Sequence, residues 1–163
     1  DVTQMPFRDG SVDNFVGIDV MHHFADADTF LREIGRCLGH GGRLVLIEPW
    51  NNRLARWIYT RFHPEPFDPD AGWTLSRGGP MSSANGALPW IVFVRDRERF
   101  HRLNGGLRIV NIKPISALAF LLSGGSGTRF GAPGFVYRMV RSLDTLLSKF
   151  GIGLSALLVV ERL

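Results

Sequence analysis

Apolar and polar positions follow three successive patterns over the first fifty residues. Residues 14–20 are rich in β-branched and aromatic side chains, which predicts a β-strand. Apolar residues then recur at three- and four-residue spacing from Phe30 to Leu38, which predicts a helix that the glycine-rich segment 39–42 ends. Residues 43–48 contain an unbroken apolar run, the pattern of a strand covered on both faces of a parallel sheet. The order strand, helix, strand predicts a β-α-β unit with a right-handed crossover.

The segment that follows has a looser pattern and many residues that break regular structure. Residues 52–62 carry apolar side chains at helical spacing, so we expect a helix there with one apolar face. The residues on that face are Leu54, Trp57, Ile58 and Phe62. Prolines and glycines are frequent from 63 to 89, and a connection of that length is typical of a lid or a substrate-binding loop.

Regular patterns return in the last third of the chain. We expect a helix at 95–103 and a strand at 107–112, which Pro114 would end. Apolar residues from Phe135 to Phe150 repeat at helical spacing and predict a strongly amphipathic helix. Residues 156–160 are all apolar and predict a final strand.

Size and composition fit a single soluble globular domain of 163 residues. We divide it into a core β-α-β part at 1–49, an inserted lid or substrate region at 50–94, and a C-terminal α/β part at 95–163. Hydrophobic residues make up 45% and charged residues 21%, which is ordinary for such a domain. The formal net charge of +4 comes from scattered basic residues, which favours solvated helix faces; attraction to an anionic substrate or membrane surface is the alternative.

Cysteine usage and the polar N-terminus bear on the compartment of the cell. Cys37 is the one cysteine, so no internal disulfide is possible, and its place in an apolar helix stripe predicts a core residue. The first residues show no signal-peptide pattern. The longest near-apolar run, 115–122, is far shorter than the roughly 20 residues that span a membrane. We therefore expect a cytoplasmic protein without a transmembrane segment.

A series of short motifs stands in consistent order in the first fifty residues. The motifs are Asp1-Val2, Met5-Pro6-Phe7, Asp9, Ser11-Val12-Asp13, Met21-His22-His23-Phe24, Asp26, Leu31-Arg32-Glu33-Ile34, Arg36, Leu38, Gly41-Gly42 and Glu48-Pro49. This series closely resembles the second half of the class I, type-11-like methyltransferase domain, whose members depend on S-adenosylmethionine. The rest of the chain resembles that family in the order of its elements, which ends in a helix and a strand.

The resemblance implies an α/β class with a partial Rossmann-like methyltransferase fold, in which a mostly parallel sheet has an antiparallel last strand. It also implies S-adenosylmethionine as cofactor, with the Asp1 carboxylate accepting a hydrogen bond from the adenine amino group and Val2 beside the ring. Val20, Met21 and His22 would line the floor near the methionine and its methyl group, outside the carboxyl ends of the parallel strands.

The same family has a glycine-rich turn and a ribose-binding acidic residue that would lie upstream of Asp1. No G-x-G-x-x-G pattern follows a strand in this sequence. The segment 124–127 is glycine-rich but lacks the lysine of a phosphate loop, so we interpret it as a loop or hinge. We therefore expect the N-terminal βαβ units and the glycine-rich motif to be missing, and the chain to be a truncated fragment with impaired activity alone.

Candidate chemistry gathers around the ends of the two predicted strands. His22 and His23 are candidate catalytic bases because a histidine pKa lies near neutral; alternatively, one packs against the strand end and the other faces solvent. Glu48 is a candidate acceptor-binding residue or a solvated carboxylate at the rim. Trp50 and Trp57 are candidate walls of a pocket for a small-molecule or lipid-like acceptor, or part of the lid's own core. The five histidines show no metal-ligand spacing, so no metal is expected.

Two other classes of function stay open. The chain would be a non-catalytic interaction module, or a homo-oligomer, if an exposed sheet edge pairs with another chain. It would be a peripheral membrane protein if residues 115–122 and nearby arginines bind a lipid surface. No nucleic-acid partner is expected. The sequence leaves open the acceptor and whether oxygen, nitrogen or carbon is methylated.

Overall fold

A four-stranded sheet in the order β1-β2-β4-β3 forms the centre of the computed structural model, which describes residues 1–75, 83–116, 118–122 and 133–163. The strands are β1 (Val12–Ile18), β2 (Leu38–Pro49), β3 (Leu107–Ile115) and β4 (Ser155–Arg162). The helices are η1 (Met21–His23), α1 (Ala27–Cys37), α2 (Arg53–Phe62), α3 (Leu88–Trp90), the π-helical turn η2 (Ile91–Arg95), α4 (Arg97–Leu103), α5 (Ala119–Leu122) and α6 (Gly134–Lys149).

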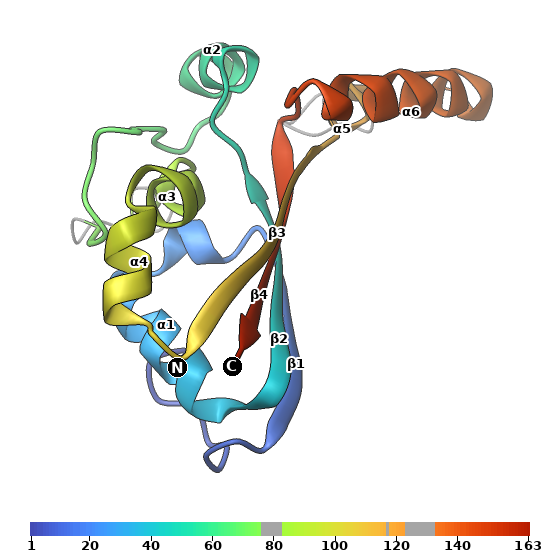
Figure 1. The fold of residues 1–163 in the computed structure, drawn as a ribbon. Helices are drawn as coiled ribbons and strands as arrows, with labels where there is room; N and C mark the ends of the chain where they lie inside the picture. The colour runs from blue at the N-terminus through green and yellow to red at the C-terminus, as the bar shows by residue number, and fades with distance from the viewer. Residues whose placement is uncertain (76–82, 117, 123–132) are drawn as a thin grey trace.

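The sheet is mostly parallel with an antiparallel last strand, as expected. β1 and β2 are parallel, and β4 runs antiparallel to both of its neighbours, β2 and β3. β1, β2 and β3 therefore run in one direction. Figure 1 shows α1, α3 and α4 on one face of the sheet, whereas α2, α5 and α6 lie beyond the end at which β1, β2 and β3 finish.

The core lies between the sheet and the helices that cover it. Asp26 caps α1, because its carboxylate accepts a hydrogen bond from the backbone N–H of Asp28 at 2.9 Å. The side chains on the inner face of α1 are buried, and they include the expected stripe Phe30, Leu31, Ile34 and Cys37. Across the sheet, Leu46 of β2 pairs with Leu158 of β4, and both are buried. Cross-strand apolar pairs of this kind stabilise the sheet.

The glycine-rich segment after α1 does not act as a separate helix stop, which corrects the sequence-based expectation. α1 ends at Cys37, and β2 begins at once with Leu38. The pairing of β1 with β2 then shifts register, from Val12 opposite Leu38 to Asn14 opposite Arg43, so the glycines form an irregular part of the strand. A Cβ on Gly42 would lie 2.8 Å from the carbonyl oxygen of Gly39, so this approach of two backbones requires glycine.

Two other expectations differ in part from the structure. The helix expected at 95–103 forms as α4, and it continues a helical run that begins at Leu88. This run belongs to the main core, since Leu88, Phe93 and Phe100 are fully buried. Pro114 also does not end β3. It pairs with Ala156 of β4, which is possible because β3 is an edge strand whose outer side needs no N–H donor.

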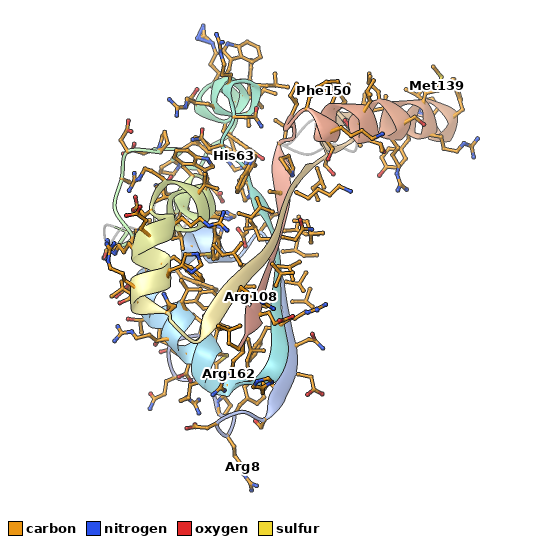
Figure 2. All side chains as sticks on the ribbon, in the orientation of Figure 1. Arg8, His63, Arg108, Met139, Phe150 and Arg162 are labelled. Atoms are coloured by element: carbon orange, nitrogen blue, oxygen red, sulfur yellow. The ribbon has the colours of Figure 1, made fainter. Side chains whose placement is uncertain are left out.

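The helices α2 and α6 form where the periodicity predicts them, but their expected apolar faces are not covered. On α2, Ile58 is buried together with Ala55 and Tyr59, whereas Trp57 and Phe62 are more than half exposed. Met139 on α6 and Phe150 just after it are exposed and labelled in Figure 2, and Asp144 is the buried residue of the helix. Within the described residues, no helix is long and apolar enough to span a membrane. The glycine-rich segment 124–127 lies outside the described residues.

Candidate functional site

The candidate site lies beyond the carboxyl ends of β1 and β2, at the edge of the sheet that these strand ends form. β1 stops at Ile18, and Asp19 follows with a φ of 51°, in the left-handed region that Asp tolerates better than most non-glycine residues. The backbone N–H of Asp19 donates to the carbonyl of Ile47 in β2 at 2.9 Å. The chain then turns into η1, which brings His22 next to Glu48 at the end of β2. In parallel sheets, ligands bind outside this edge.

Glu48 is a fully buried carboxylate that holds η1 in place. Its Oε1 accepts hydrogen bonds from the backbone N–H groups of Val20 at 3.0 Å and Met21 at 2.8 Å. Its Oε2 lies 2.7 Å from Nδ1 of His22. The interpretation of Glu48 as a solvated carboxylate at the rim is therefore wrong. The structure gives it a positioning role, in which a charged acceptor satisfies three buried or half-buried donors.

His22 is buried, and its ring is oriented by the hydrogen bond to Glu48. Because a carboxylate can only accept, Nδ1 of His22 carries the proton of that bond, and Nε2 points the other way, 3.3 Å from Oε2 of Glu65. Burial lowers the pKa of His22, but the hydrogen bond to Glu48 and the negative charges of Glu48, Glu65 and Asp19 outweigh this effect and raise the pKa above 6.5.

The surrounding polar side chains line a cavity of about 130 Å³ next to His22. Its lining consists of Asp19, His22, His23, Pro49, Tyr59, His63 and Glu65. Oε1 of Glu65 lies 3.7 Å from Nε2 of His23, and its Oε2 lies 3.9 Å from Nδ1 of His63. Figure 2 shows His63 between α2 and α3. The cavity thus combines three imidazoles with carboxylates from two different parts of the chain.

Tyr59 and Asp19 give this cavity its remaining polar character. The Tyr59 hydroxyl donates to the carbonyl of Leu154 at 2.8 Å, and burial raises the pKa of Tyr59, so its phenol stays neutral. Burial and the negative charge of Glu48 raise the pKa of Asp19. No pattern in the sequence indicated Tyr59, His63 or Glu65 as site residues. They come from α2 and the proline-rich segment after it, and they reach His22 through tertiary folding alone.

Other predicted site residues lie in different surroundings. Asp1 is exposed, and its Oδ1 accepts hydrogen bonds from the backbone N–H and hydroxyl of Thr3 at 2.9 and 2.7 Å. Val2 is half-buried against the main core. Met21 is fully buried, whereas Val20 is 37% exposed, so Val20 offers the larger side-chain surface to a ligand at this edge.

The two predicted pocket tryptophans are separated from the His22 cavity. Trp50 is buried in the main core, and its backbone N–H donates to the carbonyl of Leu154 at 2.8 Å. Trp57 is 55% exposed on α2 and packs edge-to-face on Phe62, with 5.5 Å between ring centroids. The cavity lining contains neither tryptophan.

Comparisons with known proteins identify the fold. Residues 1–46 match the family model described as a methyltransferase domain. Over nearly the whole chain, the structure superposes on solved structures that carry this fold. The chain has a class I methyltransferase fold. A comparison with proteins of curated function finds no match.

Three solved structures illustrate the likeness of the methyltransferase fold. A geranyl diphosphate C-methyltransferase from Streptomyces coelicolor A3(2) has a TM-score of 0.51 and 15% identity, and the match covers 100% of this chain and 51% of that one. A Haloferax volcanii protein in complex with a methyltransferase activator gives 0.51 and 17%, covering 99% and 58%. The cyclase SpnF gives 0.51 and 18%, covering 99% and 54%. The chain thus spans between half and three fifths of these structures, and identities this low establish the fold alone.

Proposed function

We propose that the chain supplies the acceptor-binding side of an S-adenosylmethionine-dependent methyltransferase that acts on a small-molecule or lipid-like acceptor. The observation that carries this proposal is the buried pair of Glu48 and His22, which opens on a cavity at the ligand-binding edge of the sheet. Support also comes from the methyltransferase-domain match of residues 1–46, which contain His22 and His23. The geranyl diphosphate methyltransferase holds S-adenosylhomocysteine in its structure.

Two side chains, of which Val20 lies at this edge, can contact the cofactor. The exposed Asp1 carboxylate can accept from the adenine amino group, and the half-exposed Val20 can contact the methionine end, beside His22. When bound, S-adenosylmethionine supplies the methyl group and becomes S-adenosylhomocysteine. Glu48 engages the backbone N–H groups of Val20 and Met21, so these two donors are not available to a ligand.

His22 takes the proton that the acceptor loses, and Glu48 orients it. With Nδ1 donating to Glu48, the lone pair of Nε2 faces the cavity and can accept a proton from an acceptor O–H or N–H. The carboxylate then stabilises the imidazolium that forms. His23 has 39% of its side chain exposed and lies at the mouth of the cavity, where it can contact the acceptor or relay the proton outward.

The test compares cofactor affinity with turnover in the natural protein that contains these residues. Calorimetry with S-adenosylhomocysteine measures affinity, and transfer of a labelled methyl group to candidate acceptors measures turnover. We expect His22→Ala to lose at least tenfold in turnover while it keeps cofactor affinity. His40→Ala is the control, because His40 is exposed at the opposite end of β2. Unchanged turnover in both His22→Ala and His23→Ala would refute the role of this cavity.

A non-catalytic interaction role is the second candidate function, and exposed apolar side chains favour it. Phe135 and Met139 on α6 and Phe150 just after it are each more than 60% exposed, and β1 is an edge strand with Val16 73% exposed. Exposed apolar surface of this kind marks interaction sites. Light scattering over a concentration series tests this role: a chain that stays monomeric throughout argues against self-association through these surfaces.

A further inference from the structure

We propose that His22, His23 and Glu65 form a binding site for a divalent transition metal ion such as Zn²⁺. The donor atoms of these three side chains all lie within 4.8 Å of one another. They belong to η1 and to the proline-rich segment after α2, so only the folded chain brings them together. The proposal goes beyond methyl transfer and does not depend on it.

The contact between His22 and Glu65 requires a positive charge. Nδ1 of His22 donates to Glu48, so Nε2 of the neutral ring presents a lone pair. That lone pair lies 3.3 Å from Oε2 of Glu65, which is also an acceptor. Both side chains are largely buried: 3% of the His22 side chain and 13% of the Glu65 side chain are exposed. Two buried acceptors at this distance repel unless a positive charge lies between them, and a metal ion or a proton on Nε2 would supply it.

The separations fit a metal coordination shell. Metal–nitrogen and metal–oxygen bonds of about 2.1 Å in tetrahedral geometry place neighbouring donor atoms about 3.4 Å apart. In the structure, Nε2 of His22 lies 3.3 Å from Oε2 of Glu65, and Nε2 of His23 lies 3.7 Å from Oε1 of Glu65. With all three donor atoms within 4.8 Å of one another, the side chains have to draw together around a bound ion to reach bonding distance.

The surroundings of His22 match what a metal-binding histidine requires. Such a histidine donates its second ring N–H to a carboxylate, which fixes the tautomer and raises the basicity of the ligating nitrogen. Glu48 makes this contact at 2.7 Å and is itself fixed by two backbone N–H groups. Its charge, with those of Glu65 and Asp19, makes the cavity negative when the histidines are neutral.

The ligand set selects the class of metal and leaves room for a further ligand. Two imidazoles and one carboxylate suit Zn²⁺, Fe²⁺ or Co²⁺, whereas Mg²⁺ and Ca²⁺ prefer oxygen donors alone. Three protein ligands leave a fourth position open, and the cavity of about 130 Å³ can hold a water molecule there. Because the metal would use Nε2 of His22, a loaded site would block proton transfer to that atom, so metal binding and the proposed base role exclude one another.

The test is a metal titration that needs no methyl-transfer activity. Zn²⁺ is titrated into the metal-free chain by calorimetry, and Co²⁺ is followed by its visible absorption, which reports coordination geometry. We expect one saturable site, and at least a tenfold loss of affinity in Glu65→Gln and in His23→Ala. Circular dichroism checks that each variant is folded.

Two further variants, a control and a variant of the residue that orients His22, make the outcome decisive. His101→Ala removes an exposed histidine on α4 and should leave affinity unchanged. Glu48→Gln keeps all three ligands but alters the partner of His22, and should weaken binding about 10- to 100-fold. The proposal is overturned if Zn²⁺ shows no saturable binding, which would leave a proton on His22 as the cation. It is also overturned if Glu65→Gln binds Zn²⁺ as tightly as the wild type.

Discussion

Replacement of Glu48 should destabilise the fold by an amount that depends on which of its hydrogen bonds survives. Glu48→Ala removes the acceptor for the N–H groups of Val20 and Met21 and for Nδ1 of His22. Glu48→Gln has nearly the same shape, and its amide oxygen still accepts from the two backbone groups. Glu48→Gln therefore tests the charge with the shape preserved, whereas Glu48→Ala also removes the backbone hydrogen bonds and the packing of the side chain.

The expected magnitude follows from the burial of each donor. The N–H of Met21 is buried, so its loss of an acceptor costs about 1–3 kcal/mol, whereas the half-exposed Val20 can bind water instead. The charge-assisted bond to His22 contributes about 1.5–3 kcal/mol more. We therefore expect Glu48→Ala to lower the free energy of unfolding by about 3–5 kcal/mol, in line with other broken buried ion pairs. Glu48→Gln loses the charge but keeps an acceptor, so about 1–2 kcal/mol is expected.

Urea denaturation followed by circular dichroism at neutral pH measures both variants. A loss of 3–5 kcal/mol is a large part of the 5–15 kcal/mol that stabilises a typical domain, so the shift in midpoint should be plain. If Glu48→Ala is no less stable than Glu48→Gln, or if both lie within about 0.5 kcal/mol of the wild type, the hydrogen bonds of Glu48 do not hold this edge.

Three further predictions concern other parts of the chain. Hydrogen bonds from Arg36 lower the pKa of Glu33 from 4.5 to about 2, so the stability that Glu33 adds is present above pH 4.5 and is lost as the pH falls toward 2. Urea midpoints measured between pH 2 and 6 should therefore depend less on pH in Glu33→Gln than in the wild type. Gly153→Ala should lower the free energy of unfolding by on the order of 1–3 kcal/mol, because the added Cβ would lie 2.6 Å from the backbone of β3. Gly72→Ala is the control, because a Cβ there meets nothing within 4 Å, and thermal melts compare the two variants. Met139→Gln should change the free energy of unfolding by less than about 0.5 kcal/mol, since Met139 is 71% exposed; a larger loss in urea would show that α6 is packed in solution.

The sequence predicted the fold well where local pattern and tertiary packing agree. The stripe from Phe30 to Cys37 becomes the buried face of α1, and the apolar run in β2 becomes a central strand. Periodicity failed where burial depends on a distant surface. α6 has the repeat of an amphipathic helix, yet its buried residue is Asp144, which accepts from the N–H groups of Leu118 and Ala119 at 2.7 and 2.8 Å. Spacing along a helix identifies a face but not what covers it.

The candidate site was predictable in part, for a related reason. The sequence placed His22, His23 and Glu48 at the same edge, because the ends of successive parallel strands meet there. It did not show that Glu48 is buried, since a glutamate at a strand end is usually solvated. Glu65 was missed altogether, because its segment is rich in proline and glycine and has no periodicity that fixes its position. The histidines show no metal-ligand spacing in the sequence, but such spacing appears only when the ligands come from one segment. The proposed ligands come from separate segments.

Glu48 is required both for the proposed proton transfer and for the proposed metal site, whereas Glu65 is required as a ligand for the metal site alone. Substitutions at these two positions therefore distinguish the two proposals. Both need the lone pair of His22 at Nε2, and Glu48 provides it by holding the proton on Nδ1. In Glu48→Gln, the side-chain amide can donate to Nδ1, which would move the ring proton to Nε2 and remove the lone pair from the cavity. That variant should therefore lower turnover and metal affinity together. Glu65→Gln removes a metal ligand but leaves the bond between His22 and Glu48 intact, so it should weaken metal binding far more than turnover. If Glu65→Gln instead abolishes turnover and leaves metal affinity unchanged, Glu65 acts on the acceptor and the metal assignment fails.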